Sequence, residues 1–408
     1  MKTESFDVII VGAGPGGCAC ALSLAASGLR IALIEKDVFP RDKICGDALS
    51  PDVVNQLGLL PGGAKTCFEA AACKVKIHGV RIYSPDAACL EAGLTSKDAR
   101  QPIGYLMKRW DFDHLLFEQV KVYDTITVFE NCKATRVAAT DEAITLIAED
   151  RAFEGKMAVG ADGAHSILAR HAGIAVEKPH YCAGLRAYYE NVGGFHERQY
   201  IEFHFYEDIL PGYFWIFPLP NNQANVGIGM LSSALKKKKV RLKSKLEEII
   251  REHPNVAPRF RQARQRGTVQ GFGLPLGSKK RRISGERFVL VGDAASLIDP
   301  LTGEGIGNAM RSGRIAAAHL LNCFEQQDFS ASFNQGFDAA IYRMMGRELK
   351  FSRFLQASLV RPSVFNFLAK RIRRSRSLKA FLTYLVEEDV VYKALHPSIP
   401  SLPGFAKR

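Results

Sequence analysis

The sequence predicts an α/β fold: a parallel sheet, an antiparallel sheet inserted into it, and a C-terminal helical section. Short apolar runs rich in β-branched residues, one near the N-terminus and one near residue 290, are typical of buried parallel strands. Segments of alternating polarity lie between these two runs. From about residue 330 the spacing of the apolar residues is mostly helical, which predicts a separate section after the sheets.

The N-terminal segment predicts a strand, a tight turn, a helix and a second strand. Residues 6–11 form the first apolar run, residues 12–17 are rich in glycine, and residues 18–27 are rich in alanine and leucine. Residues 31–34 repeat the pattern of a buried strand. Because the turns between these elements are short, the two strands must be parallel and joined by a right-handed crossover.

Four alternating segments predict the inserted sheet, which we expect to be largely antiparallel. They are residues 75–83, 199–206, 213–217 and 225–230, with turn residues between them. After them, residues 287–291 return to the pattern of a buried parallel strand, and residues 305–324 have helical spacing.

Composition and charge narrow the class of protein. With 47% hydrophobic and 24% charged residues among 408, the chain can bury a large core, which excludes disordered and fibrous classes. The formal net charge is +13, and basic residues concentrate at 236–245 and 361–379. Such a balance suggests acidic ligands, anionic lipids or nucleic acid, although either run can equally be a solvated face. We expect no nucleic-acid partner.

Cysteine usage and hydropathy bear on location. The nine cysteines form no C-x-x-C pair and no metal-ligand cluster, so we expect no metal site. Their odd number argues against a complete disulfide framework and favours reduced thiols in a cytoplasmic setting. Glu4 and Asp7 stand where a signal peptide needs cations. No uninterrupted apolar run is long enough to cross a bilayer, so any membrane contact would be peripheral.

Gly12, Gly14 and Gly17 have the G-x-G-x-x-G spacing of a dinucleotide-binding turn. Without side chains the backbone can approach a pyrophosphate, and the helix N-terminus supplies N–H donors. Glu35, at the end of the second strand, can accept hydrogen bonds from both ribose hydroxyls and disfavours a 2′-phosphate. We therefore expect FAD or NAD, unless the glycines serve only helix–strand packing. The predicted cofactor-binding residues of this segment also include Pro15 and Lys36.

Residues 160–170 resemble the D-G-x-x-S-x-x-R element of flavoprotein hydroxylases and related reductases. In those proteins the element lies near the flavin and the route by which nicotinamide enters. Asp162 and Gly163 carry the resemblance and are predicted to bind the cofactor. The alternative is an ordinary Asp-Gly turn that caps a helix.

Residues 291–309 form the third and most specific segment. Asp293 resembles the family aspartate that binds a ribityl hydroxyl of FAD. The glycines after Pro300 would bring backbone N–H groups and a helix N-terminus to the pyrimidine edge of the flavin, where they stabilise the anionic reduced form. The predicted cofactor-binding residues here are Gly292, Asp293, Pro300, Gly303, Gly305 and Ile306.

Three such segments in this order resemble the FAD-dependent oxidoreductases of the p-hydroxybenzoate hydroxylase-like superfamily. The resemblance implies an FAD/NAD(P)-binding Rossmann-like domain with an inserted antiparallel substrate domain. Residues 109–116 resemble the family helix R-x-x-F-D-x-x-L, whose arginine reaches toward the flavin; Arg109 could instead make a surface ion pair. We expect FAD-binding parts at 1–70, 101–175 and 276–328, substrate-domain parts at 71–100 and 176–275, and a helical section at 329–408.

Two further segments resemble the geranylgeranyl reductase family. Residues 213–218 resemble its Y-x-W-x-F-P motif, and residues 41–46 resemble its segment with a Cys-Gly pair. Alternation on a strand places Tyr213, Trp215 and Phe217 on one face, where they can line an apolar substrate cavity or simply pack the sheet. The second segment adds Arg41, Cys45 and Gly46 to the predicted cofactor-binding residues. Cys45 is also the candidate catalytic residue; its alternative role is that of a small buried hydrophobe.

The resemblance implies an FAD-dependent oxidoreductase that reduces C=C bonds of an isoprenoid or other apolar lipid-like substrate by hydride transfer from reduced flavin. No second dinucleotide-binding turn follows, so transiently docked NAD(P)H or a reduced ferredoxin-type protein would supply the electrons. A monooxygenase or halogenase acting on an aromatic substrate shares all three FAD segments. A flavin-containing binding or redox-sensing protein is the non-enzymatic alternative. Residue spacing singles out no proton donor.

The C-terminal section suggests a contact with the inner face of a membrane. Apolar residues alternate there with cations at roughly helical spacing, and such a helix can bury its apolar side chains among lipids while its cations face anionic headgroups. Equally, the apolar face can pack on the catalytic domains. The apolar residues are Val364, Phe365, Phe367, Leu368 and Ile372, and the cations are Lys370, Arg371, Arg373, Arg374 and Arg376.

Overall fold

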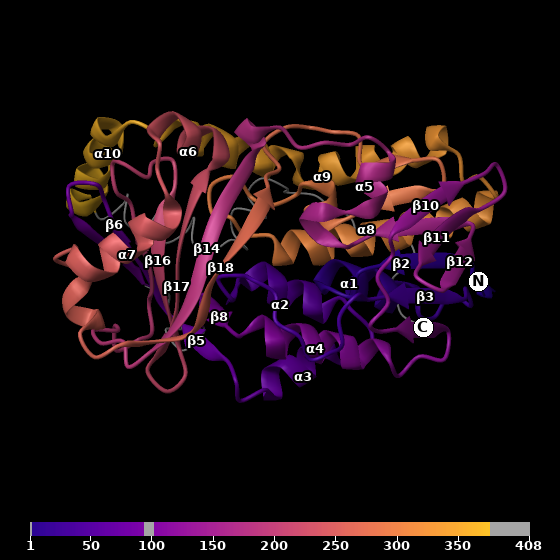
Figure 1. Cartoon of the computed structure of the whole chain (residues 1–408), viewed down its shortest axis with the longest axis horizontal. Helices are drawn as coiled ribbons and strands as arrows, with labels where there is room; N and C mark the ends of the chain where they lie inside the picture. Colours follow the sequence, from indigo (N-terminus) through magenta and orange to yellow (C-terminus); the bar gives the residue numbers. More distant parts are fainter. Residues whose placement is uncertain (1, 94–101, 376–408) are drawn as a thin grey trace.

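The computed structural model of the chain describes residues 2–93 and 102–375. A six-stranded sheet and its helices occupy the right half of Figure 1, and a seven-stranded sheet occupies the left half. The predicted α/β fold is confirmed, including the inserted sheet and the C-terminal helices. Within the described ranges, no helix combines the length and the apolar character that crossing a bilayer requires.

The six-stranded sheet is parallel except at one edge. The predicted strand–turn–helix–strand unit forms its centre, because β2 and β3 are paired in parallel and fully buried. The strand order is β19 (Ser284–Gly285), β20 (Phe288–Leu290), β13 (Met157–Gly160), β2 (Val8–Val11), β3 (Ile31–Ile34) and β9 (Ile126–Phe129), with only β19 antiparallel.

Helices pack on this sheet, and the two central ones approach each other closely. A Cβ atom on Gly313 of α8 would lie 2.2 Å from the carbonyl oxygen of Gly16 in α1, so only glycine fits there. The helices are α1 (Pro15–Leu24), α2 (Pro51–Gly58), α3 (Ala64–Ala70), α4 (Arg109–Val120), α5 (Ile167–His171) and α8 (Ile306–Gln326). A four-stranded sheet at the right end of Figure 1 has the order β1 (Lys2–Ser5), β12 (Arg151–Gly155), β11 (Ile144–Ala148) and β10 (Arg136–Ala139).

The seven-stranded sheet is antiparallel except where β15 meets β6, so the predicted inserted sheet is confirmed. Helices α6 (Ser232–Lys238) and α7 (Leu242–Glu252), which carry the first basic run, contribute to an apolar cluster on one of its faces. The strand order is β18 (Arg264–Pro275), β14 (Tyr181–Glu190), β17 (Gln223–Leu231), β16 (Tyr213–Leu219), β15 (Ile201–His204), β6 (Gly79–Tyr83) and β7 (Cys89–Gly93).

One predicted strand is wrong, and strands β7, β14 and β18 of the large sheet were not predicted. The segment 75–83 divides at His78: β5 (Val75–Ile77) pairs with β8 (Gly104–Leu106) in a small sheet that also contains β4 (Ala48–Leu49), whereas β6 joins the large sheet. A Cβ atom on Gly79 would lie 2.4 Å from the Tyr200 ring, so the division falls where the chain passes under that ring. Strands β14 and β18 lack regular alternation because glycines and partly buried polar residues interrupt both.

The C-terminal section consists of α9 (Ala331–Ser358) and α10 (Pro362–Arg374). The Phe365 ring of α10 packs 4.8 Å from the Phe205 ring next to the large sheet and is buried. Phe367 and Leu368, by contrast, are 58% and 41% exposed. The apolar residues of α10 therefore divide between a packed face and an exposed face, and Arg376 lies outside the described residues.

Candidate active site

The three glycine-containing segments meet at the carboxyl edge of the parallel sheet. They follow β2, β13 and β20, which are neighbours with the same direction, so their ends lie side by side. A Cβ atom on Gly12, whose φ is +98°, would lie 2.5 Å from the carbonyl oxygen of Ala161. Gly12 thus allows the first and second segments to touch backbone to backbone.

The first turn of α1 is suited to an anion. Its N-terminal residue Pro15 follows Gly14, and no side chain within the described residues caps the helix. At Gly17 a Cβ atom would lie 1.9 Å from the Gly12 carbonyl oxygen, so this glycine closes the turn. A Cβ atom on Gly14 would meet only the Arg41 guanidinium, at 3.9 Å. Backbone N–H groups and one cation therefore converge beside Gly14, as a diphosphate requires.

Glu35 ends β3 as a buried carboxylate. Its Oε2 accepts a hydrogen bond from the Ala13 N–H at 2.9 Å, and its Oε1 accepts one from the Asp37 N–H at 3.2 Å. Because each carboxylate oxygen can accept a second hydrogen bond, Glu35 retains acceptors for ribose hydroxyls. Lys36 is largely exposed and pairs with Asp37 at 3.7 Å, so the structure shows no contact that would assign it a part in binding.

Arg109 and Arg41 share the buried carboxylate of Asp113. Arg109 donates to both Asp113 oxygens, at 2.5 and 2.7 Å, and Arg41 donates to Oδ2 at 2.6 Å. Burial would raise the pKa of Asp113, but the two guanidiniums hold it below its usual range. The surface ion pair considered for Arg109 is wrong because the pair is buried. Asp113, which sequence reasoning missed, fixes Arg41 beside the glycine turn.

The second segment forms a short 3₁₀ turn, η1 (Gly163–His165), before α5. Asp162 Oδ2 accepts a hydrogen bond from the Ile167 N–H at 2.7 Å, so this residue closes the turn, as the Asp-Gly alternative expects. Burial raises the pKa of Asp162. Nothing within 4 Å would meet a Cβ atom on Gly163, which has a φ of +78° and faces open space.

The third segment holds Asp293 in the 3₁₀ turn η4 (Gly292–Ala295), where Lys43 Nζ approaches Asp293 Oδ2 at 3.4 Å. Gly292 has a φ of +56° and lies against Ala309. Helix α8 then begins at Ile306 after Gly305, and among the described residues no side chain caps it. Its free N–H groups suit partial negative charge at this end of the site.

Tyr213 and Gln356 fix the loop before α8 from opposite directions. The Tyr213 hydroxyl donates to the Thr302 carbonyl, and a Cβ atom on Gly303 would lie 3.1 Å from that hydroxyl. The Gln356 amide of α9 donates to the Pro300 carbonyl. The third segment is thereby attached both to the large sheet and to the C-terminal helices.

Cys45 and Gly46 lie against the aromatic strand. A Cβ atom on Gly46 would be 3.1 Å from the Phe217 ring and 3.9 Å from Trp215 Nε1. The Tyr213, Trp215 and Phe217 rings follow one face of β16 with centroids 6.0 and 6.1 Å apart. Trp215 and Phe217 are buried in an apolar cluster. The structure thus brings together both segments that resemble the geranylgeranyl reductases.

Sequence reasoning also missed Asp47 and Asn225. Asn225 Oδ1 accepts a hydrogen bond from the Trp215 indole at 2.9 Å, and its Nδ2 donates to the Cys45 carbonyl and to Asp47 Oδ2, both at 2.8 Å. Both Asn225 and Asp47 are completely buried. The available signal was Asn225 itself, a polar side chain within an otherwise buried apolar strand.

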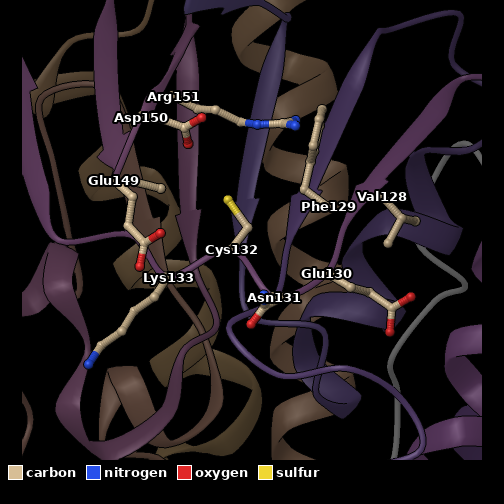
Figure 2. Close-up of a pocket in the computed structure, with 10 residues that line it drawn as sticks. Val128, Phe129, Glu130, Asn131, Cys132, Lys133, Glu149, Asp150 and Arg151 are labelled. Carbon is tan, nitrogen blue, oxygen red and sulfur yellow. The ribbon is translucent and has the colours of Figure 1, made fainter. Parts of the chain in front are cut away.

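A cavity of about 410 Å³ lies beside the carboxyl end of β9, the edge strand that pairs with β3 (Figure 2). Its walls come from β9, the turn that follows it and the β11–β12 hairpin. Cys132 and Phe129 border it, and their backbones pair with Glu35. None of the predicted site residues lines this cavity, which therefore belongs to the periphery of the site.

The residues present fit FAD. The open position over Gly14 beside Arg41 suits the diphosphate, Glu35 suits the adenosine ribose, and Asp293, in the turn after β20, would accept a hydrogen bond from a ribityl hydroxyl. The uncapped N-terminus of α8 suits the electron-accepting ring.

Comparison with known proteins also indicates an FAD-binding protein. Residues 5–327 match the family described as FAD binding domain. The chain is 32% identical over 363 residues to a digeranylgeranylglycerophospholipid reductase of Methanocella arvoryzae, which covers 86% of each chain. The chain belongs to the geranylgeranyl reductase family of FAD-dependent oxidoreductases.

Solved structures show the same relationship. A geranylgeranyl bacteriochlorophyll reductase-like protein of Thermoplasma acidophilum aligns with a TM-score of 0.80 at 25% identity, covering 97% of this chain and 100% of the other. The flavin-dependent brominase Bmp2 aligns with a TM-score of 0.73 at 18% identity, covering 94% of each chain. The brominase therefore shares the fold, whereas the reductases also share the sequence.

Replacing Asp293 with Ala tests the third segment of this FAD-dependent enzyme. We expect the fold to persist and FAD binding to weaken roughly 10- to 150-fold, because a charge-assisted hydrogen bond of about 1.5–3 kcal/mol is lost. The measurement is FAD bound per chain after equilibration at limiting FAD. Asp124→Ala is the matched control, because this exposed residue precedes β9 at the amino ends of the strands, opposite the site. Full occupancy of Asp293→Ala would contradict the assignment.

Proposed function

We propose that the enzyme reduces C=C bonds in the isoprenoid chains of a lipid. The observation that carries the proposal is the contact between the Cys45–Gly46 segment and the aromatic row of β16, beside the flavin-binding loop. The relative from Methanocella arvoryzae, named a digeranylgeranylglycerophospholipid reductase, supports this substrate class. When bound, reduced FAD supplies the hydride.

The protein contributes an apolar wall and a fixed geometry. Phe203 packs edge-on against Tyr213 at 5.1 Å and against Phe217 at 5.2 Å, which keeps the aromatic row rigid. Buried aromatic side chains exclude water and offer an isoprenoid apolar contact without hydrogen bonds. The Cys45 thiol lies beside this wall and near Arg109, which supports its proposed place at the reacting face.

The electrons must come from outside the site. We propose transiently docked NAD(P)H or a reduced ferredoxin-type protein as the donor, because the described residues contain a single dinucleotide-binding turn. Anaerobic bleaching of the flavin by NADH, NADPH or a reduced ferredoxin, each tested separately, distinguishes these donors.

We also propose that the enzyme binds peripherally to the inner face of a membrane, where its lipid substrate resides. The end of α9 and the outer face of α10 expose apolar side chains beside exposed cations. The apolar ones are Phe351, Phe354, Val360, Phe367 and Leu368, and the cations include Arg361, Lys370, Arg371, Arg373 and Arg374. The packed face of α10 anchors this surface to the large sheet through Phe365.

Anaerobic turnover tests the reaction class. With a reduced donor and a panel of unsaturated prenyl lipids, we expect products heavier by two hydrogens per reduced bond, detected by mass spectrometry. A monooxygenase or halogenase would instead require oxygen, so the control is oxygen consumption with NADPH and aromatic substrates. Oxygen-dependent product and no anaerobic product would refute the proposal.

Trp215→Phe tests the aromatic wall. Alanine is unsuitable because the cavity left by a buried ring costs about 3–5 kcal/mol. Phenylalanine keeps an apolar ring but leaves Asn225 Oδ1 without its donor, so we expect lipid reduction to fall about tenfold, equivalent to about 1.4 kcal/mol. Flavin reduction by the donor should change less than twofold. Trp110→Phe, on the exposed side of α4, is the control. Equal losses in flavin reduction and in lipid reduction would indicate that Trp215 only packs the core and does not contact the substrate.

Vesicle co-sedimentation tests the membrane surface. The protein should pellet with anionic but not neutral vesicles at low salt. Replacing Arg371, Arg373 and Arg374 with Gln should weaken binding about 100-fold, since each cation contributes about 1 kcal/mol. A matched variant with Lys236, Lys237 and Lys239 replaced by Gln removes equal charge from an exposed run elsewhere and should still pellet. Equal loss in both variants would indicate a response to net charge alone.

A further inference from the structure

Asp47 lies at the junction between the FAD-binding region and the large sheet. It follows the Cys45–Gly46 pair, has a φ of +66° and is completely buried. Its backbone carbonyl accepts a hydrogen bond from the Met107 N–H at 3.0 Å, directly before α4. A carboxylate so placed must find all of its hydrogen-bond partners within the protein.

Three donors surround the Asp47 carboxylate. The Tyr188 hydroxyl donates to Oδ2 at 2.7 Å, Asn225 Nδ2 donates to Oδ2 at 2.8 Å, and the Arg109 N–H donates to Oδ1 at 3.3 Å. Two of these donors come from β14 and β17 of the large sheet, and the third comes from α4 of the FAD-binding region. The Asp47 carboxylate therefore connects the two regions. All three groups direct a hydrogen at the carboxylate, as the ionised form of Asp47 requires, because it can only accept hydrogen bonds.

Asn225 connects the Asp47 carboxylate to Trp215 and Cys45 by hydrogen bonds. With Nδ2 directed at Asp47 and at the Cys45 carbonyl, its Oδ1 must face the Trp215 indole. Rotating the amide by half a turn would place an NH₂ group against the indole N–H and an oxygen against the Asp47 carboxylate. The indole N–H and the Cys45 carbonyl both require this amide orientation, and the ionised carboxylate adds a third hydrogen bond that holds the Asn225 side chain in it.

Protonation of Asp47 would weaken the hydrogen bond that holds Asn225. Burial raises its pKa to about 6, although the hydrogen bonds from Tyr188 and Asn225 and the charge of Arg186 favour ionisation. The neutral acid is a weaker acceptor than the carboxylate for the Tyr188 hydroxyl and the Asn225 amide, and its O–H needs an acceptor of its own. The charged and titratable groups around it are Arg186, Tyr188, Arg109, Asp113, Lys108, Cys45 and Asp42.

We propose that Asp47 is a positioning residue: its carboxylate anchors the Asn225 side chain, which holds the Trp215 indole and the Cys45 carbonyl in place for lipid reduction. The inference rests on the proposed function for its catalytic meaning, but the orientation itself is independent of the substrate. Because the ionised form is the productive one, the rate of lipid reduction rises with pH through about 6.

The indole N–H of Trp215 provides a readout that does not depend on turnover. The chain has two tryptophans, and in holoenzyme labelled with ¹⁵N-tryptophan the half-exposed Trp110 serves as the internal reference. We expect the Trp215 signal to shift with a midpoint near pH 6 while the Trp110 signal stays in place. In Asp47→Asn the titration should disappear, and the rate of lipid reduction should be at least tenfold lower and independent of pH near 6.

Two further variants keep the proposal testable if Asp47→Asn does not fold. Tyr188→Phe removes a hydrogen bond that favours the ionised carboxylate, so the midpoint should move to higher pH. Tyr189→Phe is the matched control, because that hydroxyl bonds Gln265 and should leave the midpoint unchanged. A Trp215 signal that does not titrate in the native enzyme, or one that Tyr188→Phe leaves unmoved, would overturn the proposal. A normal titration without any lipid reduction would instead count against the proposed function alone.

Discussion

The backbone contact between Gly12 and Ala161 is the constraint on which the site depends. A side chain at position 12 would meet the Ala161 carbonyl at 2.5 Å, so the ends of β2 and β13 converge only because this residue is glycine. Their convergence brings the glycine turn against the Asp162–Gly163 turn. The same sheet order places Asp293 one strand further along, after β20. Short, close-packed strand ends thus create one continuous edge for a long cofactor.

Two buried carboxylates, Asp113 and Asp47, lie between the FAD-binding edge and the large sheet, and their hydrogen-bond partners differ. Asp113 contacts two guanidiniums, which keep its pKa low despite burial, so its charge is permanent over the physiological range. Asp47 accepts hydrogen bonds from a hydroxyl, an amide and a backbone N–H, and no ion pair joins it to a cation among the described residues; burial raises its pKa to about 6, although the charge of Arg186 lowers it. The Asp113 joint therefore keeps its charge near neutral pH, whereas the Asp47 joint has the higher pKa.

The large sheet shows why some elements escaped prediction. Strands β16 and β17 are apolar along most of their length and buried on both faces, and they were found, whereas β14 and β18 were not, because glycines and polar residues interrupt their apolar pattern. The helical periodicity of α10 was visible as well. Its division into a packed face around Phe365 and an exposed face around Phe367 depends on where the neighbouring strands end, which periodicity does not encode.

The sequence by itself determined the parallel nucleotide-binding unit, the FAD segments and the aromatic strand, because each follows from local spacing and local backbone geometry. It indicated the Cys45–Gly46 segment and β16 separately, and only the tertiary structure brought Gly46 within 3.1 Å of the Phe217 ring. The partners of Asp47 and Asn225 were likewise decided by the fold. These two residues are 178 positions apart, and a hydrogen bond at that separation depends on how the sheets dock, for which no local pattern in the chain is specific.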